Sequence, residues 1–449
     1  MSLAVSPAQA RPGLTTGFLE TRYSSSNALE RNQSFDSTVD ARAGIIREHA
    51  FWRAIAATKP SDPRNPADPA YNWGRLDDTV RGARSHDLAV LLTITGAPNW
   101  AEGKNRPNNV NPGAWKPRPN ALDDFAHAIA ERYSGDFLGL PRVKHFQAWN
   151  EPTLDVHLAP QYNGKRQVSA AHYKRMLNAF YGGVKSVHDD NVVVTGGTAP
   201  YGEPPGGDRT RPLTFWRKVL CLKDRRQLND SACPVKPKFD ILAHHPINTS
   251  GGPRQSAINP NDASTPDLDK VRRTLRAAER HDNVFTPGRH PLWATELWWE
   301  SDPPDGFEGI PLQKHARYIE EALYILWRDG ARVVINLQLR DAAFDRNNPF
   351  GETVTGVFFR NGDPKPAYTA FRFPFVTERQ SRSRIRAWGK APASGQLRIQ
   401  RRQNGDWQTM KTLPAASGEV FSTSVRLRGR EELRATVAGN TSLVWQQRG

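Results

Sequence analysis

The chain has 449 residues and a formal net charge of +16, from 62 Lys and Arg against 46 Asp and Glu. This length exceeds one small domain and predicts a large core with an appended module. No apolar run approaches the roughly 18 residues of a membrane-spanning helix, so we expect none. The thirteen tryptophans exceed what a core needs, and such flat amphipathic side chains suit interfaces and sugar-binding clefts.

The N-terminus and the cysteines bear on the compartment. Residues 8–10 read Ala-Gln-Ala, the small-x-small pattern of a signal-peptidase site, although no apolar stretch precedes them. We expect residues 1–14 to be the remainder of a secretory leader or a disordered N-terminus, and the protein to be secreted. Cys221 and Cys233 lie twelve residues apart in a polar segment. In an exported protein they form one disulfide, and in a cytosolic enzyme they stay free thiols.

The positive charge is concentrated at the C-terminal end. Residues 376–449 hold fourteen Lys and Arg against five Asp and Glu, a net charge of +9, which leaves +7 for the first 375 residues. A basic surface attracts polyanions in general, so nucleic acid, anionic lipid and acidic polysaccharide are all admissible partners on charge alone. The sequence has no recognised nucleic-acid-binding motif, which argues against a specific DNA or RNA partner.

From residue 15 onward, strand-like and helix-like segments alternate for eight rounds. The apolar runs and their stops predict strands at 17–20, 44–52, 89–95, 143–153, 191–196, 239–245, 291–296 and 333–339. Helical spacing of apolar residues predicts helices at 37–43, 73–86, 120–133, 169–188, 213–222, 268–281 and 312–328.

This alternation over residues 15–375 predicts a parallel sheet covered by helices. We favour a closed (β/α)8 barrel over an open doubly wound sheet, because the count is eight and no G-x-G-x-x-G phosphate turn follows the first strand. Functional side chains are then expected where the strands end. The long segments 59–72, 103–119 and 248–266 are expected to build the walls of a cleft at that rim.

After residue 375 the pattern changes to short segments of period two, separated by turn residues. They lie at 384–388, 396–399, 407–410, 421–425 and 433–437. The spacing predicts a small antiparallel β-sandwich over residues 376–449. Its arginine-rich strands either contact an acidic polysaccharide or coat a soluble accessory domain.

Two of the predicted barrel strands end in glutamate. Side chains two apart share a face of a strand, so we expect Gln147, Trp149 and Glu151 on one face of the fourth strand, and Ala294 and Glu296 on one face of the seventh. In a closed barrel both carboxylates reach the same rim. Paired carboxylates across a cleft can cleave a glycosidic bond, one protonating the leaving oxygen while the other attacks the anomeric carbon or activates water.

These motifs resemble those of a known family. Trp149-Asn150-Glu151-Pro152 resembles the acid/base motif of the retaining (β/α)8 glycoside hydrolases, and residues 294–299, Ala-Thr-Glu-Leu-Trp-Trp, resemble their nucleophile strand. Arg47, the His244-His245 pair and the segment 362–368 are supporting matches. The layout is most similar to glycoside hydrolase family 39, with family 5 as a neighbour, and the resemblance covers about residues 15–375.

The resemblance implies roles for individual residues. Glu151 would be the general acid/base, with its pKa raised, and Glu296 the nucleophile, paired with a donor such as Arg47. Asn150 would bind the 2-hydroxyl of the sugar. The implied substrate-binding residues are Arg47, His49, Trp52, Trp100, Trp149, Asn150, His244, His245, Trp298 and Trp299.

Several alternatives stay open at this point. Arg47 could instead pair with Glu20 or Glu48, His245 could be a core histidine, and each tryptophan could serve packing. The family often has His-x-Tyr at the sixth strand, where this chain has His-His-Pro. A barrel that binds carbohydrate without cleaving it is the main alternative function. No ligand spacing of His or Cys suggests a metal, and we expect no cofactor.

Overall fold

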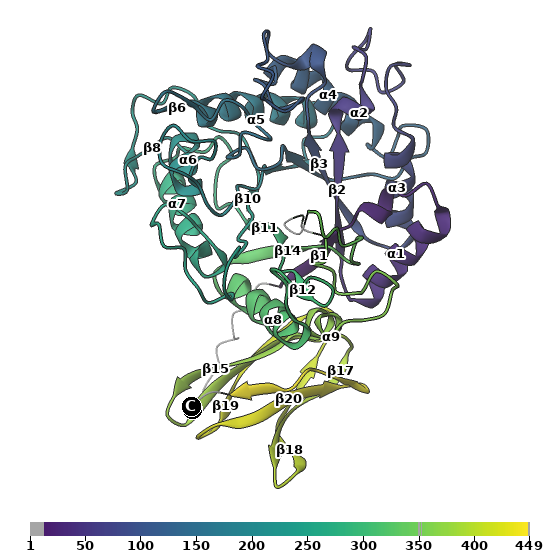
Figure 1. Ribbon diagram of the computed structural model, residues 1–449, viewed down its shortest axis with the longest axis vertical. Helices are drawn as coiled ribbons and strands as arrows, with labels where there is room; N and C mark the ends of the chain where they lie inside the picture. Colours follow the sequence, from purple (N-terminus) through teal and green to yellow (C-terminus); the bar gives the residue numbers. More distant parts are fainter. Residues whose placement is uncertain (1–12, 349–350, 352, 448–449) are drawn as a thin grey trace, which may run out of the picture.

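The computed structural model describes residues 13–348, 351 and 353–447. Its centre is an eight-stranded parallel sheet with helices around it, and two antiparallel sheets lie beneath (Figure 1). The predicted fold class, a (β/α)8 barrel with a small C-terminal β-domain, is confirmed. All but two residues of the predicted N-terminal leader, 1–14, lie outside the described residues.

The eight strands run in the order expected for a barrel. Neighbours in the sheet are β10 (Leu242–His244), β11 (Leu292–Leu297), β14 (Ala331–Leu337), β1 (Thr15–Leu19), β2 (Ile45–Phe51), β3 (Ala89–Thr95), β4 (His145–Ala148) and β7 (Val192–Thr195). The ring closes between the first and last of these. Thr195 donates its N–H to the carbonyl of Ile241 at 2.9 Å, and His245 donates to the carbonyl of Thr198 at 3.0 Å.

The helices follow the strands one by one. Their bounds are α1 (Ala28–Asp40), α2 (Trp52–Ile55), α3 (Gly74–Ser85), α4 (Pro119–Arg132), α5 (Ser169–Lys185), α6 (Pro212–Val219), α7 (Leu268–Arg280), α8 (Leu312–Arg328) and α9 (Pro366–Arg372). The predicted first helix, 37–43, is wrong. Helix α1 begins nine residues earlier, where the side chain of Asn27 accepts from the N–H groups of Leu29 and Glu30 and caps it.

Alternation along the strands separates two apolar layers. In β2, Ile45 belongs to a small cluster inside the barrel and Ile46 to the large cluster between strands and helices. Arg47, two residues after Ile45, therefore faces the barrel interior with its charge. Because the apolar interior cluster fills the barrel, polar chemistry is confined to the strand ends.

The C-terminal sheets contain all five predicted period-two segments. One sheet joins β15 (Phe375–Ser381), β16 (Arg384–Lys390) and β19 (Val420–Arg426). The other joins β18 (Asp406–Ala415), β17 (Gly395–Gln403), β20 (Glu431–Val437) and β21 (Asn440–Thr441), with β22 (Trp445–Gln447) paired to β20. Strand β15 was not predicted.

The C-terminal sheets pack on the barrel through aromatic side chains. Trp388 of β16 is fully buried, and its ring lies 5.3 Å from that of Tyr324 and 5.6 Å from that of Trp327, both in α8. Nearby, the buried Lys390 ammonium donates to the Thr16 hydroxyl at 3.1 Å. The two parts of the chain thus share a buried boundary.

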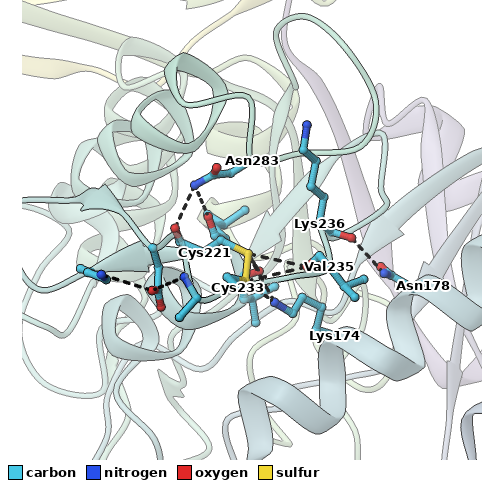
Figure 2. The surroundings of a disulfide bond; sticks show 12 residues. Lys174, Asn178, Cys221, Cys233, Val235, Lys236 and Asn283 are labelled. Atoms are coloured by element: carbon cyan, nitrogen blue, oxygen red, sulfur yellow. Dashed lines mark hydrogen bonds and ion pairs between the residues drawn. A yellow bond between two sulfur atoms is a disulfide. The ribbon is translucent and has the colours of Figure 1, made fainter.

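Cys221 and Cys233 form a disulfide, as expected for an exported chain. Figure 2 shows the Lys174 ammonium directed at the sulfur of Cys233, 2.8 Å away. The amide of Asn283 donates to the carbonyl of Cys221 at 2.9 Å and so holds the segment from the other side. This bridge closes a loop that follows α6.

Removing this bridge should lower stability by a predictable amount. We expect the double variant Cys221→Ser/Cys233→Ser to lose about 2–3 kcal/mol of unfolding free energy, because closing a short loop restricts the unfolded chain. Urea unfolding monitored by tryptophan fluorescence measures the change. A reducing agent should destabilise the natural protein by a similar amount and leave the double variant unaffected. Equal stability of the two proteins would contradict the prediction.

None of the described helices is both long enough and apolar enough to cross a bilayer. The described residues also hold no group of three or more His, Cys, Asp or Glu side chains arranged to bind a metal ion.

Candidate active site

The two predicted catalytic glutamates meet at the carboxyl ends of the barrel strands. Glu151 follows β4 and Glu296 lies near the end of β11. Their side chains are 14% and 12% exposed, so both carboxylates are shielded but reachable. His245, after β10, lies between them: its Nδ1 is 2.9 Å from Oε1 of Glu151 and 3.6 Å from Oε2 of Glu296. The cluster is thus built from the ends of three strands that are far apart in sequence.

The end of β4 departs from regular strand geometry. Regular pairing stops at Ala148, and the backbone φ angles of Trp149 and Glu151 are +79° and +37°. The predicted shared face of Gln147, Trp149 and Glu151 is therefore wrong for Trp149. Its ring is 1% exposed in the outer core, and its Nε1 donates to the carbonyl of His157 at 2.8 Å. The left-handed residues turn Glu151 back into the cleft.

The end of β11 departs in a different way. The pairing of β11 with β14 shifts register between Ala294 and Leu297. Such a bulge lets consecutive side chains reach the same side. Thr295 and Glu296 both contact the barrel interior, whereas Ala294 lies in the outer core, so the predicted common face of Ala294 and Glu296 is wrong.

Arg47 is the fixed centre of the site. Its guanidinium is fully buried, and burial lowers its pKa from the usual value while the charge of Glu296 opposes that shift. Every nitrogen of the fork has an acceptor, so the group is locked in one orientation. Nε donates to Thr93 Oγ1 and to Gln147 Oε1, each at 3.0 Å. Nη1 donates to Glu296 Oε2 at 3.0 Å and to the Thr295 carbonyl at 3.1 Å. Nη2 donates to Asn150 Oδ1 at 2.6 Å.

A directional chain of hydrogen bonds leads from Arg47 to Glu151. Because a guanidinium can only donate, the atom of Gln147 that faces Arg47 is the acceptor Oε1. The Nε2 of Gln147 then donates to the Thr295 hydroxyl at 3.1 Å. The proton of that hydroxyl needs an acceptor, and among the described residues Nε2 of His245, 3.1 Å away, is the one within reach, so Nε2 accepts. The proton of His245 then lies on Nδ1 and is donated to Oε1 of Glu151.

The burial of His245 agrees with this neutral form. Burial and the nearby charge of Arg47 lower the pKa of His245 to about 3, although Glu296 opposes the shift. The imidazole fits because residue 197 is glycine, where an added Cβ would lie 2.1 Å from Nε2 of His245. A side chain at this position would push the ring away from both carboxylates.

Burial raises the pKa of Glu151, and nearby positive charges partly offset this. The largest of these opposing contributions comes from His157, whose Nε2 lies 3.8 Å from Oε2 of Glu151. Burial in turn lowers the pKa of His157, although the charge of Glu151 opposes the shift. A carboxyl with a raised pKa can hold a proton at a pH where an exposed glutamate has lost it.

Two more predicted residues lie at the edge of this cluster. His49, two residues along β2 from Arg47, packs edge-on against Phe51 at 5.4 Å, and its buried Nε2 has no partner within the described chain. Its pKa is held well below the usual range by burial and by the charge of Arg47. Trp298 is half-buried on the interior cluster, with an indole N–H that also lacks a partner there. Each therefore leaves one buried polar atom without a partner among the described residues.

The remaining predicted residues serve packing or structure. Trp52 is fully buried and stacks on Phe125. Trp100 packs edge-on against Trp52. Trp299 is 5% exposed and donates to the carbonyl of Gly251. His244 turns away from the cleft and bonds the Thr198 hydroxyl and the Ala263 carbonyl.

Three residues of the site were not predicted: Thr93, His157 and Thr295. Strand alternation placed Gln147 on the face of Glu151, but no role was predicted for it. Thr295 depends on the bulge of β11 and His157 on a loop, and neither has a sequence signal.

No protein-family model and no curated protein matches this sequence. Solved structures do match the fold. A family 39 glycoside hydrolase from Bacteroides cellulosilyticus WH2 has a TM-score of 0.57 at 16% identity, over 93% of this chain and 81% of that one. A glucosidase from Croceicoccus marinus has a TM-score of 0.53 at 13% identity, over 93% of this chain and 94% of that one. A GH39 enzyme from Xanthomonas axonopodis pv. citri has a TM-score of 0.54 at 13% identity, over 93% of this chain and 92% of that one. The predicted resemblance to family 39 is confirmed at the level of the fold.

Proposed function

We propose that this protein is a retaining glycoside hydrolase that cleaves O-glycosidic bonds of an oligo- or polysaccharide. The contact of His245 with both carboxylates carries the proposal. Nδ1 of His245 lies 2.9 Å from Glu151 Oε1 and 3.6 Å from Glu296 Oε2, so these two oxygens are at most about 6.5 Å apart, the sum of the two distances. This limit favours the carboxyl separation of retaining enzymes, about 5–5.5 Å, over the longer separation of inverting enzymes.

In the first step, a carboxylate oxygen of Glu296 attacks the anomeric carbon and the bond to the leaving oxygen breaks. Glu151 gives its proton to that oxygen, and a glycosyl ester on Glu296 remains. In the second step, Glu151 takes a proton from water, the water oxygen bonds to the anomeric carbon, and the Glu296 carboxylate leaves. Arg47 supports both steps because it pairs with the Glu296 carboxylate whenever that charge is present.

The hydrogen-bond chain assigns the proton of Glu151 to one oxygen. Oε1 accepts the Nδ1–H of His245, so the transferable proton belongs on Oε2, on the side of His157. Asn150 is oriented in the same manner. Its Oδ1 accepts from Arg47, and its Nδ2 lies 3.4 Å from Nε2 of His157, so the second N–H of Nδ2 is the donor for a sugar hydroxyl oxygen.

The pH dependence tests this assignment. The first step needs protonated Glu151, so kcat/KM falls as pH rises through the Glu151 pKa, and this basic limb lies above the usual glutamate range. His245→Phe removes the hydrogen-bond donor that stabilises the ionised form of Glu151, so the pKa of Glu151 should rise. We therefore expect the basic limb of the kcat/KM profile to move to a higher pH by about one unit. His245→Asn, which keeps an N–H near the Nδ1 position, should shift it less. An unmoved limb in His245→Phe would refute the chain.

The stereochemistry of cleavage tests the function itself. A panel of nitrophenyl α- and β-glycosides is incubated with the enzyme, and proton NMR records the anomer that forms first. We expect cleavage of at least one glycoside with retention of configuration, because two successive displacements restore it. A first-formed sugar of inverted configuration would exclude the double displacement. Binding of glycosides without cleavage across the panel would favour a carbohydrate-binding protein.

We also propose that the enzyme acts outside the cell and that residues 376–449 form an accessory domain on a catalytic barrel, 15–375. The Cys221–Cys233 disulfide supports export, since such bonds persist mainly in oxidising compartments. The buried Trp388 contact supports an accessory role in which the sheets stabilise α8.

A further inference from the structure

A pocket lies where the loop after β4 meets the start of α5. It has a volume of about 490 Å³ and is bordered by the segment 115–116, the loop 158–163 and the start of α5. Two aromatic side chains, Trp115 and Tyr162, line it together with Lys116, Arg175 and His172. The pocket thus combines flat apolar walls with positive charge.

The charge of this pocket is not balanced. No Asp or Glu lines it. Lys116 and Arg175 are both exposed, and neither has a carboxylate partner within the described chain. Arg254, in contrast, pairs with Glu321. The neighbouring turn adds Lys165 and Arg166. The local field therefore favours an anionic ligand.

Both cations are held in place by neighbouring groups. His172 donates from Nε2 to the Pro117 carbonyl at 3.0 Å, so its Nδ1 is free to accept from Arg175 at 3.1 Å. Burial, followed by the charge of Arg175, lowers the pKa of His172 to about 4, which keeps it neutral and able to accept. Lys116 lies over the Trp115 ring, 4.3 Å from its centre. A ligand meets two oriented cations and little ordering is required.

The pocket is joined to the loop that follows Glu151. The N–H of Lys116 donates to the Ala159 carbonyl at 3.0 Å, and Ala159 donates to Ala114 at 2.8 Å. The same loop carries His157, which approaches Glu151. The loop that borders the pocket is therefore the same loop that approaches Glu151.

We propose that this pocket binds an anionic sugar unit, through a carboxylate or sulfate group held between Lys116 and Arg175 with its ring against Trp115 or Tyr162. The carbohydrate nature of the ligand rests on the proposed function; its charge rests on the pocket alone. The aromatic walls favour a sugar over a phosphopeptide, since sugar rings present flat C–H faces to such side chains. The substrate class is then an acidic polysaccharide.

The test compares acidic polymers with their neutral counterparts. Affinity gel electrophoresis measures binding of the full chain to polygalacturonate and its fully methyl-esterified form, and to dextran sulfate and dextran. We expect binding to at least one acidic polymer and to neither neutral one. The double variant Lys116→Gln/Arg175→Gln should weaken that binding about 10-fold or more, because two charge-assisted contacts are lost. The carboxylate and sulfate arms identify the anionic group.

A matched control removes the same charge elsewhere. Arg398→Gln/Arg426→Gln changes two exposed arginines of the C-terminal sheets and should bind like the natural protein. Equal weakening by both double variants, or tighter binding of single-stranded DNA than of every acidic polysaccharide, would overturn the proposal. Cleavage of aryl glycosides is measured in parallel. Cleavage of an aryl glycoside without selective binding of an acidic polymer would refute the anionic-sugar site and leave the proposed function intact. Selective binding of an acidic polymer without cleavage of any aryl glycoside would refute the proposed function and leave the anion-binding pocket intact.

Discussion

Replacing Glu296 with glycine is expected to reduce kcat on any aryl glycoside that the enzyme cleaves by roughly 10⁴-fold or more, because no glycosyl ester can form. The protein should stay folded, since the buried Arg47 keeps its bonds to Thr93, Gln147, Asn150 and the Thr295 carbonyl. Initial rates with the natural protein and the variant, both checked by circular dichroism, measure the effect.

Azide distinguishes the roles of the two glutamates. Added to Glu296→Gly, azide enters the space of the lost carboxylate, and we expect a glycosyl azide of inverted configuration. Glu151→Ala, which loses about 10²–10⁴-fold in rate, keeps its nucleophile and should give a glycosyl azide of retained configuration. The opposite pairing of variants and products would exchange the assigned roles.

Glu308 supplies the control for this experiment. It is an exposed glutamate in the segment that follows β11, the strand of Glu296. Glu308→Gly should leave kcat unchanged. Full activity of Glu296→Gly, or a comparable loss in Glu308→Gly, would contradict the assignment of Glu296 as the nucleophile.

Much of the barrel could be predicted because its strands are continuous apolar runs that end at recognisable breakers. The run at 89–95 coincides with β3, and the helix at 312–328 coincides with α8. Helix α1 was placed wrongly because few of its residues are apolar, so it gives little periodicity; only Phe35 among its buried residues is strongly hydrophobic. Its Asn27 cap was the better signal.

The catalytic pair could also be predicted, because two strands end in glutamate and share a rim once the barrel closes. The detailed contacts could not. The left-handed backbone at Trp149 and Glu151 and the bulge of β11 decide which side chains face the cleft, and both depend on packing with neighbouring strands. The packing role of Trp52 could not be predicted either, because it depends on the position of Phe125, on which the Trp52 ring stacks.

The largest stability effect is expected at Arg47. Arg47→Met should lower the free energy of unfolding by about 3–5 kcal/mol, because Glu296 loses its partner and the acceptors of Gln147 and Asn150 lose their donor inside the barrel. Urea unfolding at neutral pH measures the loss. Arg53→Met is the control: Arg53 is exposed just after β2, its guanidinium donates to the Pro112 carbonyl at 3.2 Å, and the change should alter stability by less than about 0.5 kcal/mol.

A second substitution separates the charge effect from lost packing. If the cost of Arg47→Met arises from an unpaired carboxylate, Arg47→Met/Glu296→Gln should be more stable than Arg47→Met, although it carries one more change. Arg47→Lys should fall between the natural protein and Arg47→Met, since an ammonium can neutralise Glu296 but cannot also donate to Gln147 and Asn150. Equal stability of Arg47→Met and Arg53→Met would show that the buried guanidinium does not organise the site.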